Sequence, residues 1–372
     1  HFNDPELRQV TCRALNTFHK EIYGPYADRI TIAAEIPFQT PEEALREIDF
    51  AVNELGFKVI VFSLQKRPIP LVEQEKPELA NHAYRLDTFG LDSDFDYDSV
   101  WKKCIDLNVV PTSHSGGQGW GSRQSISNYM YNHIGHFAAA SEALCKSFFM
   151  GGVTRRYPNL NVAFLEAGVG WACLLYADMI GHWEKRGAKG IHQLNPSNMD
   201  DGELMALIEK FGDERVQKHL PEIKEFFEGS NAHEMGDYRA AHELWHPENI
   251  DDWALCKIEN VEDIKDLFVP NFYFGCEADD PTVSWAFDTK VNPLGARLKA
   301  MLSSDIGHWD VPDMREVVAE AYELVEDGLI SEDDFRDFAF TNAASLYTGM
   351  NPKFFEGTAC EAEAKKVVSL KH

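Results

Sequence analysis

Apolar residues occur along this chain in short runs of strand length, separated by longer stretches with helical periodicity. The short runs are rich in β-branched and aromatic residues and are bounded by Gly, Pro, Asn or Asp, which is typical of buried strands. They cover residues 29–38, 57–64, 109–114, 162–166, 271–277 and 299–305. Helical stretches separate most of these runs, and strands that alternate with helices indicate a parallel sheet.

The helix between the first two predicted strands has the clearest sequence signals. Thr40 and Glu43 have the spacing of a capping box, and Pro41 occupies the position expected for the first residue of the helix. Apolar residues then recur at helical spacing until Gly56, which is predicted to end the helix. Together these segments predict a strand, a helix and a second parallel strand.

A closed (β/α)₈ barrel needs eight strands, and six are predicted. Because the sequence starts at His1, within helix-like sequence, we predict a TIM-type α/β barrel that lacks its first strands in this chain, rather than an open doubly wound sheet. A charge-rich stretch without convincing strands is predicted to be an insertion or cap between the sixth and seventh barrel strands. The predicted divisions are barrel (1–181), insertion (182–265), barrel (266–350) and a polar, frayed tail (351–372).

Composition narrows the possible partners. The formal net charge of −26 would repel nucleic acid and anionic membranes, so neither is an expected partner. The seven cysteines show no Cys-x-x-Cys spacing, which predicts reduced thiols and a cytoplasmic protein. No apolar run has the length needed to cross a bilayer. A small-molecule substrate is the expected partner, and a homo-oligomer is possible.

Three predicted strands end on residues of types that commonly bind metal ions, namely His114, Glu166 and Asp305. The carboxyl ends of parallel barrel strands converge on one mouth, where the chemistry of such folds occurs. Imidazole and carboxylate groups suit a divalent ion, most readily zinc and alternatively manganese, so these three are the predicted metal ligands. Asp305, Glu166 and His308 are the predicted catalytic residues, although a helix cap at Asp305 and a packing role for His308 stay open.

Three further residues are predicted to contact the substrate. His114 is followed by a glycine-rich loop that contains Trp120 and Arg123, and the guanidinium of Arg123 suits a carboxylate. His136 follows His133 by three residues in a predicted helix over 127–149, so both would lie on one helix face. A structural role for His136 remains the alternative.

Five segments of the chain, taken in order, carry a family resemblance: AEIPFQTPEEALREIDFAVNELGFKVIVF, VVPTSHSG, FFMGGVTRRYPNLNVAFLEAGVGW, LSSDIGHWDVPD and FTNAASLY. Together they resemble the amidohydrolase superfamily, in the branch that includes aminocarboxymuconate-semialdehyde decarboxylase. The resemblance implies a metal-dependent (β/α)₈ barrel that cleaves a C–C or C–N bond in a small carboxylated substrate. It also implies that His114 is the ligand after the fifth barrel strand and Asp305 the ligand after the eighth.

The chain departs from that family pattern in two places, and two other functions stay open. It contains no His-x-His, and Glu166 stands where the family has a histidine. A barrel without metal could serve as a binding or scaffold protein. The residues His242, Glu243 and His246 match the His-Glu-x-x-His pattern of zinc proteases, but Pro247 directly after the second histidine is unfavourable for the helix this motif needs.

Overall fold

The computed structural model describes residues 4–80, 82–114, 124–187, 190–195, 198, 200–229 and 251–369. The chain divides into two compact units. The first contains His1–Met179 and Leu255–His372, and the second contains Ile180–Ala254. No helix among the described residues is both long enough and apolar enough to span a membrane.

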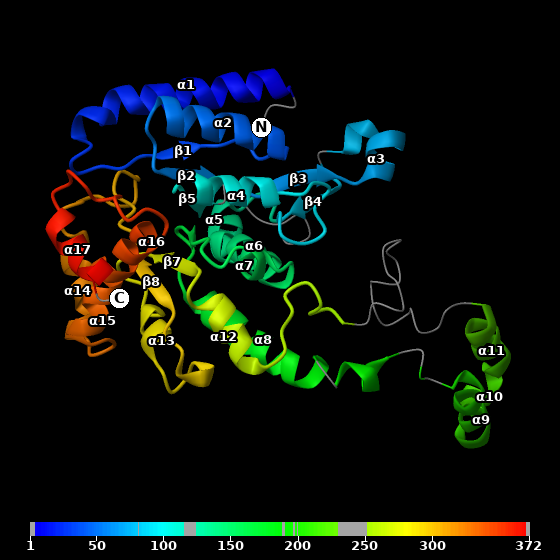
Figure 1. The fold of residues 1–372 in the computed structure, drawn as a ribbon. Coiled ribbons are helices and arrows are strands. Elements are labelled where there is room, and N and C mark those ends of the chain that lie inside the picture. Colours follow the sequence, from blue (N-terminus) through cyan, green and yellow to red (C-terminus); the bar gives the residue numbers. More distant parts are fainter. Residues whose placement is uncertain are drawn as a thin grey trace. The chain divides into compact units, whose positions relative to one another are not determined.

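The first unit is built on a six-stranded parallel sheet with the order β1-β2-β5-β6-β7-β8 (Figure 1). Each of these strands lies inside one of the predicted runs, so the prediction of six parallel strands is confirmed. In the described part of the chain β1 and β8 are the outer strands and are not hydrogen-bonded to each other. The strands are β1 (Ala33–Glu35), β2 (Val59–Phe62), β5 (Val110–Ser113), β6 (Val162–Phe164), β7 (Phe272–Cys276) and β8 (Lys299–Leu302).

Helices connect these strands and cover the sheet. The helices that lie wholly in the first unit are α1 (Pro5–Tyr23), α2 (Pro41–Asp49), α3 (Pro70–Glu75), α4 (Asp98–Asp106), α5 (Tyr129–His133), α6 (His136–Met150), α7 (Val153–Arg156), α12 (Val261–Phe268), α13 (Val283–Phe287), α14 (Val317–Glu326), α15 (Glu332–Arg336), α16 (Asn342–Met350) and α17 (Glu361–Ser369). A hairpin that the sequence pattern did not predict pairs β3 (Gln65–Pro68) with β4 (Tyr84–Asp87).

Helix α2 forms where the sequence predicts it, but only half of the capping box is present. The Thr40 hydroxyl accepts a hydrogen bond from the Glu43 backbone N–H at 3.2 Å. The Glu43 carboxylate pairs instead with the Arg8 guanidinium of α1, with a shortest N–O distance of 2.6 Å. A single π-helical turn, Phe50–Glu54, extends α2 toward Gly56. Tertiary pairing with α1 has therefore replaced a local cap.

The predicted helix over 127–149 is two helices, α5 and α6. Gly135 between them has φ of 73°, a left-handed conformation that ends one helix and allows the next to begin in a new direction. His133 is the last residue of α5, and His136 is the first of α6. The prediction that these histidines share one helix face is therefore wrong.

The C-terminal segment also differs from expectation. Instead of fraying, residues Glu361–Ser369 form helix α17, in which Ala364 and Val367 are only 2% and 7% exposed. This helix packs against α16. Two buried apolar positions three residues apart are a helical signal that the surrounding polar composition hides.

The second unit, as far as it is described, is helical. It contains α9 (Asp201–Phe211), α10 (Glu214–Lys218) and α11 (Leu220–Gly229), and α8 (Gly170–Arg186) begins in the first unit and ends in the second. Asp200 and Asp213 cap α9 and α10 by accepting hydrogen bonds from backbone N–H groups.

Aromatic side chains fill much of the core of the first unit. Phe38, just after β1, stacks on Phe62 of β2 with ring centroids 4.5 Å apart. Trp101 of α4 and Phe148 of α6, both fully buried, meet edge to face with centroids 4.8 Å apart. These contacts pack α4 against α6, and Trp101 also contacts Phe62 of β2 with ring centroids 5.7 Å apart.

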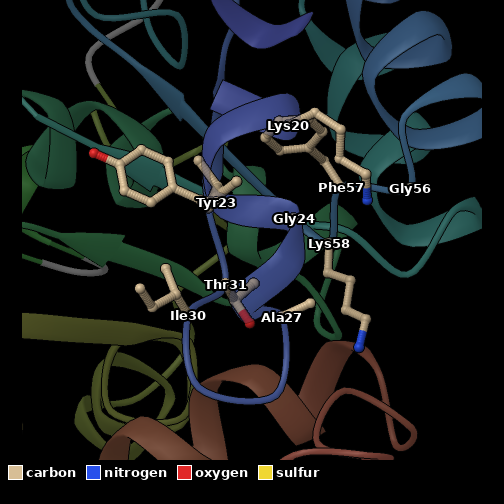
Figure 2. A pocket seen from close by; sticks show the side chains of 10 residues that line it. Lys20, Tyr23, Gly24, Ala27, Ile30, Thr31, Gly56, Phe57 and Lys58 are labelled. Carbon is tan, nitrogen blue, oxygen red and sulfur yellow. The ribbon is translucent and has the colours of Figure 1, made fainter. Parts of the chain in front are cut away.

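A small pocket of about 70 Å³ lies at the edge of the sheet where the strands begin (Figure 2). Thr31 and Ile32, just before β1, and Phe57 and Lys58, just before β2, form part of its lining. The Lys58 ammonium is already hydrogen-bonded to the Phe354 carbonyl at 2.7 Å. Because barrel chemistry occurs at the carboxyl ends of the strands, this pocket is not the candidate site.

Candidate metal centre at the carboxyl ends of the strands

Glu166 and Asp305 are placed by an unusual backbone conformation. Each follows the carboxyl end of a strand, β6 and β8 respectively, and their φ angles are 53° and 49°. Left-handed backbone at a residue other than glycine costs about 1–3 kcal/mol, and such strain concentrates at functional sites. The surrounding fold therefore holds both carboxylates in positions that the isolated segments would avoid.

Strand β7 supports the turn that contains Glu166. The Gly275 carbonyl accepts hydrogen bonds from the backbone N–H groups of Ala167 and Gly168, at 3.2 and 3.0 Å. A Cβ atom at Gly275 would lie only 2.4 Å from the Ser303 hydroxyl oxygen. The absence of a side chain at Gly275 thus lets the ends of β6, β7 and β8 approach one another closely.

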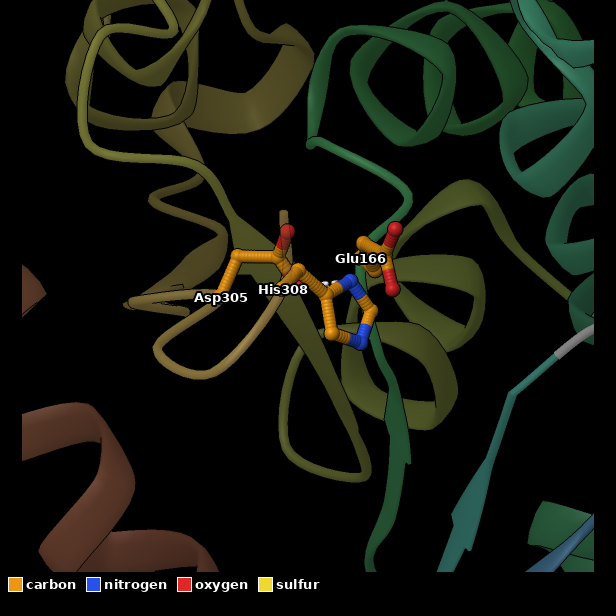
Figure 3. A group of neighbouring side chains, drawn as sticks. All are labelled: Glu166, Asp305 and His308. Atoms are coloured by element: carbon orange, nitrogen blue, oxygen red, sulfur yellow. Dashed lines mark ion pairs between the residues drawn. The ribbon is translucent and has the colours of Figure 1, made fainter. Parts of the chain in front are cut away.

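Glu166, Asp305 and His308 form a group of side chains that could hold a metal ion (Figure 3). Each offers one ligand atom, and these atoms all lie within 4.8 Å of one another. The Nδ1 atom of His308 is 2.9 Å from Oδ1 of Asp305. The structure therefore brings together the three residues that the sequence predicts to be catalytic.

His114 reaches this group through Glu166. It follows β5, and its backbone N–H donates to the Phe62 carbonyl of β2 at 3.0 Å. Its Nε2 atom is 2.6 Å from Oε2 of Glu166, and the two side chains are 33% and 13% exposed. The partly buried Glu166 carboxylate at the end of β6 is therefore paired with the His114 imidazole. A lysine, an arginine or several backbone N–H groups could also stabilise a buried carboxylate, but the partner here is a histidine.

The two carboxyl groups of the centre have pKa values displaced in opposite directions. The hydrogen bond from His114 lowers the pKa of Glu166, against the effect of burial. Burial and then the negative charge of Glu166 raise the pKa of Asp305, while His308 lowers it. Glu166 is consequently the group that stays ionised, and Asp305 is the group better able to hold a proton.

Two further carboxylates at strand ends were not identified as site residues from the sequence. Glu277 follows β7, and burial together with Asp279 and then Asp305 raises its pKa. Glu35 ends β1. Glu277 ends a predicted strand just as Glu166 does, so that signal was available. Glu35 gave none, because its predicted strand extended three residues further to Phe38.

An acidic cavity of about 530 Å³ adjoins the centre at Asp305. Its lining includes Glu277 and, from the loop and helix that follow Asp305, the carboxylates of Asp310, Asp313, Glu316, Glu320 and Glu323. A site open to such a cavity has room for a small organic molecule.

An aromatic wall lies next to His114, and it includes His133, a residue that sequence reasoning did not assign to the site. The Phe137 ring is 5.2 Å from that of His114 and 5.3 Å from that of His133. Tyr129 stacks on His133 at 5.3 Å. His136 begins the same helix as Phe137 but is 8% exposed, and burial lowers its pKa. The group formed by Glu166, Asp305 and His308 does not include His136.

The remaining predicted site residues lie outside the described part of the chain. Trp120 and Arg123 belong to the loop 115–123, and His242, Glu243 and His246 belong to 230–250. Their expected roles stay predictions.

The donor set fits a divalent cation. Within the described residues, the ion-pair partners of Glu166 and Asp305 are histidines, and neither carboxylate pairs with a lysine or arginine. Two carboxylates that repel each other, accompanied by imidazole nitrogens, are the ligand types that zinc and manganese accept. A bound cation would remove the repulsion that raises the pKa of Asp305.

Comparison with known proteins shows the family to which this chain belongs. The profile of the amidohydrolase family matches residues 2–216, which is more than half of the chain. No curated protein matches the sequence. The chain belongs to the amidohydrolase family and is an enzyme of that superfamily, as its sequence segments predicted.

Solved structures of similar fold include an amidohydrolase II, with 11% sequence identity and a TM-score of 0.50 over 94% of this chain and 80% of that one. A second is 2,6-dihydroxybenzoate decarboxylase from Rhizobium, with 15% sequence identity and a TM-score of 0.47 over 93% of this chain and 80% of that one. A third is dihydroxybenzoic acid decarboxylase from Polaromonas, solved with bound manganese and the inhibitor 2-nitroresorcinol, with 16% sequence identity and a TM-score of 0.48 over 95% of this chain and 79% of that one.

At these identities, structural likeness concerns the fold alone. The likeness to the amidohydrolase II agrees with the predicted TIM-type barrel, and the fold class is confirmed. Membership of the family confirms the expectation of a metal-dependent hydrolase or decarboxylase and does not favour a metal-free scaffold.

Proposed function

We propose that the enzyme cleaves a C–C or C–N bond in a small carboxylated, ring-containing substrate at the centre formed by Glu166, Asp305 and His308. The observation that carries this proposal is the convergence of the three ligand atoms within 4.8 Å at the strand ends. The aromatic wall of Phe137 and His133 beside His114 supports a flat ring as the substrate body. Dihydroxybenzoate is the substrate named for one structure of similar fold.

Glu166 and Asp305 would hold the ion, together with a nitrogen of His114 or His308. A divalent ion there would supply Lewis acidity toward a substrate carboxylate or toward water. The imidazole nitrogens favour zinc and the carboxylates accept manganese as readily, so zinc is the first proposal and manganese the second.

Each residue of the centre has a separate proposed role in the reaction. Glu166, whose pKa is lowered by its hydrogen bond with His114, stays a carboxylate and keeps that imidazole oriented. Asp305 is proposed to accept or release, beside the ion that it helps to hold, the proton that bond cleavage must deliver or remove. His308 fixes the Asp305 carboxylate from 2.9 Å away. Arg123 is proposed to bind the substrate carboxylate, with Trp120 and His136 as further contacts.

The competing zinc-protease hypothesis predicts a different metal site, and metal analysis separates the two. We expect purified protein loaded with zinc or manganese to bind about one equivalent of metal, measured by plasma mass spectrometry. The double substitution Glu166→Ala, Asp305→Ala should abolish this binding, because it removes both carboxylate ligands. The matched double substitution His242→Ala, His246→Ala should leave it unchanged. Loss of the metal from the histidine variant alone would contradict the proposed centre.

A further inference from the structure

Glu35 is a strand-end carboxylate to which the site described above gives no role. It is the last residue of β1, and its Cα pairs with Val61 of β2. β2 in turn pairs with β5, the strand that leads to His114. Because all these strands are parallel, Glu35 lies at the same edge of the sheet as His114, Glu166 and Asp305.

The main chain at Glu35 is fixed by a buried amide. Asn16 of α1 is 0% exposed, accepts a hydrogen bond from the Glu35 N–H at 2.8 Å and donates to the Glu35 carbonyl at 2.9 Å. β1 is an outer strand of the described sheet, so Asn16 supplies the hydrogen bonds that a neighbouring strand would otherwise make. Its Nδ2 atom also donates to Oε1 of Glu47 at 3.0 Å. The position of Glu35 is thus closely determined.

The Glu35 side chain, by contrast, makes no hydrogen bond and no close ion pair with the described residues, and its nearest opposite charge is the more distant imidazole of His114. Neighbouring glutamates in this region do make such contacts: the Glu43 carboxylate pairs with Arg8, and Glu47 accepts hydrogen bonds from Asn16 and Gln9. Glu35 is partly buried, and burial raises its pKa, an effect that the nearby His114 opposes. A partly buried carboxylate at this edge of the sheet can accept a hydrogen bond from a donor on a bound ligand.

We propose that Glu35 determines substrate specificity by accepting a hydrogen bond from a hydroxyl or amino group on the substrate ring, on the β1 side of the mouth. This inference rests on the proposed function and narrows its substrate class to carboxylic acids that carry such a donor. Glu35 is not a member of the group whose ligand atoms lie within 4.8 Å of one another, so it does not complete that metal site.

Binding of simple ring acids to the metal-loaded protein tests this proposal. The probes are benzoate and its 2-, 3- and 4-hydroxy derivatives, and calorimetry gives each dissociation constant. The parent protein should bind at least one hydroxybenzoate about tenfold more tightly than benzoate, since a hydrogen bond to a charged group has about that value. Glu35→Ala should remove this preference, leave the affinity for benzoate within about twofold and retain the metal.

Two further variants serve as controls for this experiment. Glu35→Gln keeps the shape of the side chain and an uncharged acceptor, so it should keep only part of the preference for hydroxybenzoates over benzoate. This variant also tests the proposal if Glu35→Ala does not fold. Glu42→Ala removes an exposed carboxylate from the first turn of α2 and should behave like the parent protein.

Each outcome distinguishes the inference from the function on which it rests. Full preference in Glu35→Ala or Glu35→Gln, or equal binding of all four probes by the parent protein, would overturn the role of Glu35 and leave the metal centre intact. Loss of metal from Glu35→Ala would overturn it in favour of a ligand role. Failure of the parent protein to bind metal or any probe would instead refute the proposed function.

Discussion

Replacing Asp305 by asparagine is expected to lower turnover by at least about a hundredfold, because a positioned acid or base contributes about 10²–10⁴ in rate. Asparagine has nearly the same shape and can still accept a hydrogen bond from His308, which lies 2.9 Å from the Asp305 carboxylate. It cannot hold or release a proton. Turnover should be measured at equal metal occupancy, so that a loss of rate is not confused with a loss of the ion.

Asp313→Asn is the matched control for this prediction. Asp313 lines the same acidic cavity and follows Asp305 in the same loop, but its carboxylate pairs with Arg315 at 2.6 Å. We expect this variant to retain the parent turnover. Parent turnover in Asp305→Asn with full metal occupancy would show that another residue handles the proton.

Replacing Glu166 by glutamine is expected to lower turnover by at least about tenfold, which corresponds to about 1.4 kcal/mol in the barrier. The substitution keeps the shape of the side chain and removes the charge that pairs with His114 at 2.6 Å. It also removes the negative neighbour that raises the pKa of Asp305, so the acid held by Asp305 becomes stronger. Glu142→Gln is the matched control, because Glu142 pairs with Lys146 on the surface of α6.

Folding stability separates a functional Glu166 from a structural one. The pKa of Glu166 is lowered in the folded protein, so its charge stabilises the fold above its ordinary pKa of 4.5, and this contribution is lost as the pH falls through the lowered value. Because the pair is partly exposed, Glu166→Gln should change the free energy of unfolding at neutral pH by less than about 1 kcal/mol. Unchanged turnover with a clearly lower melting temperature would assign Glu166 a structural role.

Some site residues could be found from the sequence because a strand end is a local signal. His114, Glu166 and Asp305 each follow a short apolar run directly, and parallel pairing then brings such ends to one edge. Glu35 could not be found in this way. Its predicted strand runs on to Phe38, and its main chain is held by Asn16 of α1, a contact that joins residues far apart in the sequence.

The apolar pattern of the sequence by itself determined the six parallel strands and their order of appearance along the chain, since alternating buried strands and helices leave few other arrangements. Tertiary structure alone decided the details of the centre. The left-handed backbone at Glu166 and Asp305 is strained locally and exists only because β7 and its neighbours hold it. The break at Gly135, which separates His133 from His136, and the pairing of Glu43 with Arg8 likewise depend on packing between distant segments. Local sequence encodes periodicity, whereas the distances between strand ends result from the whole fold.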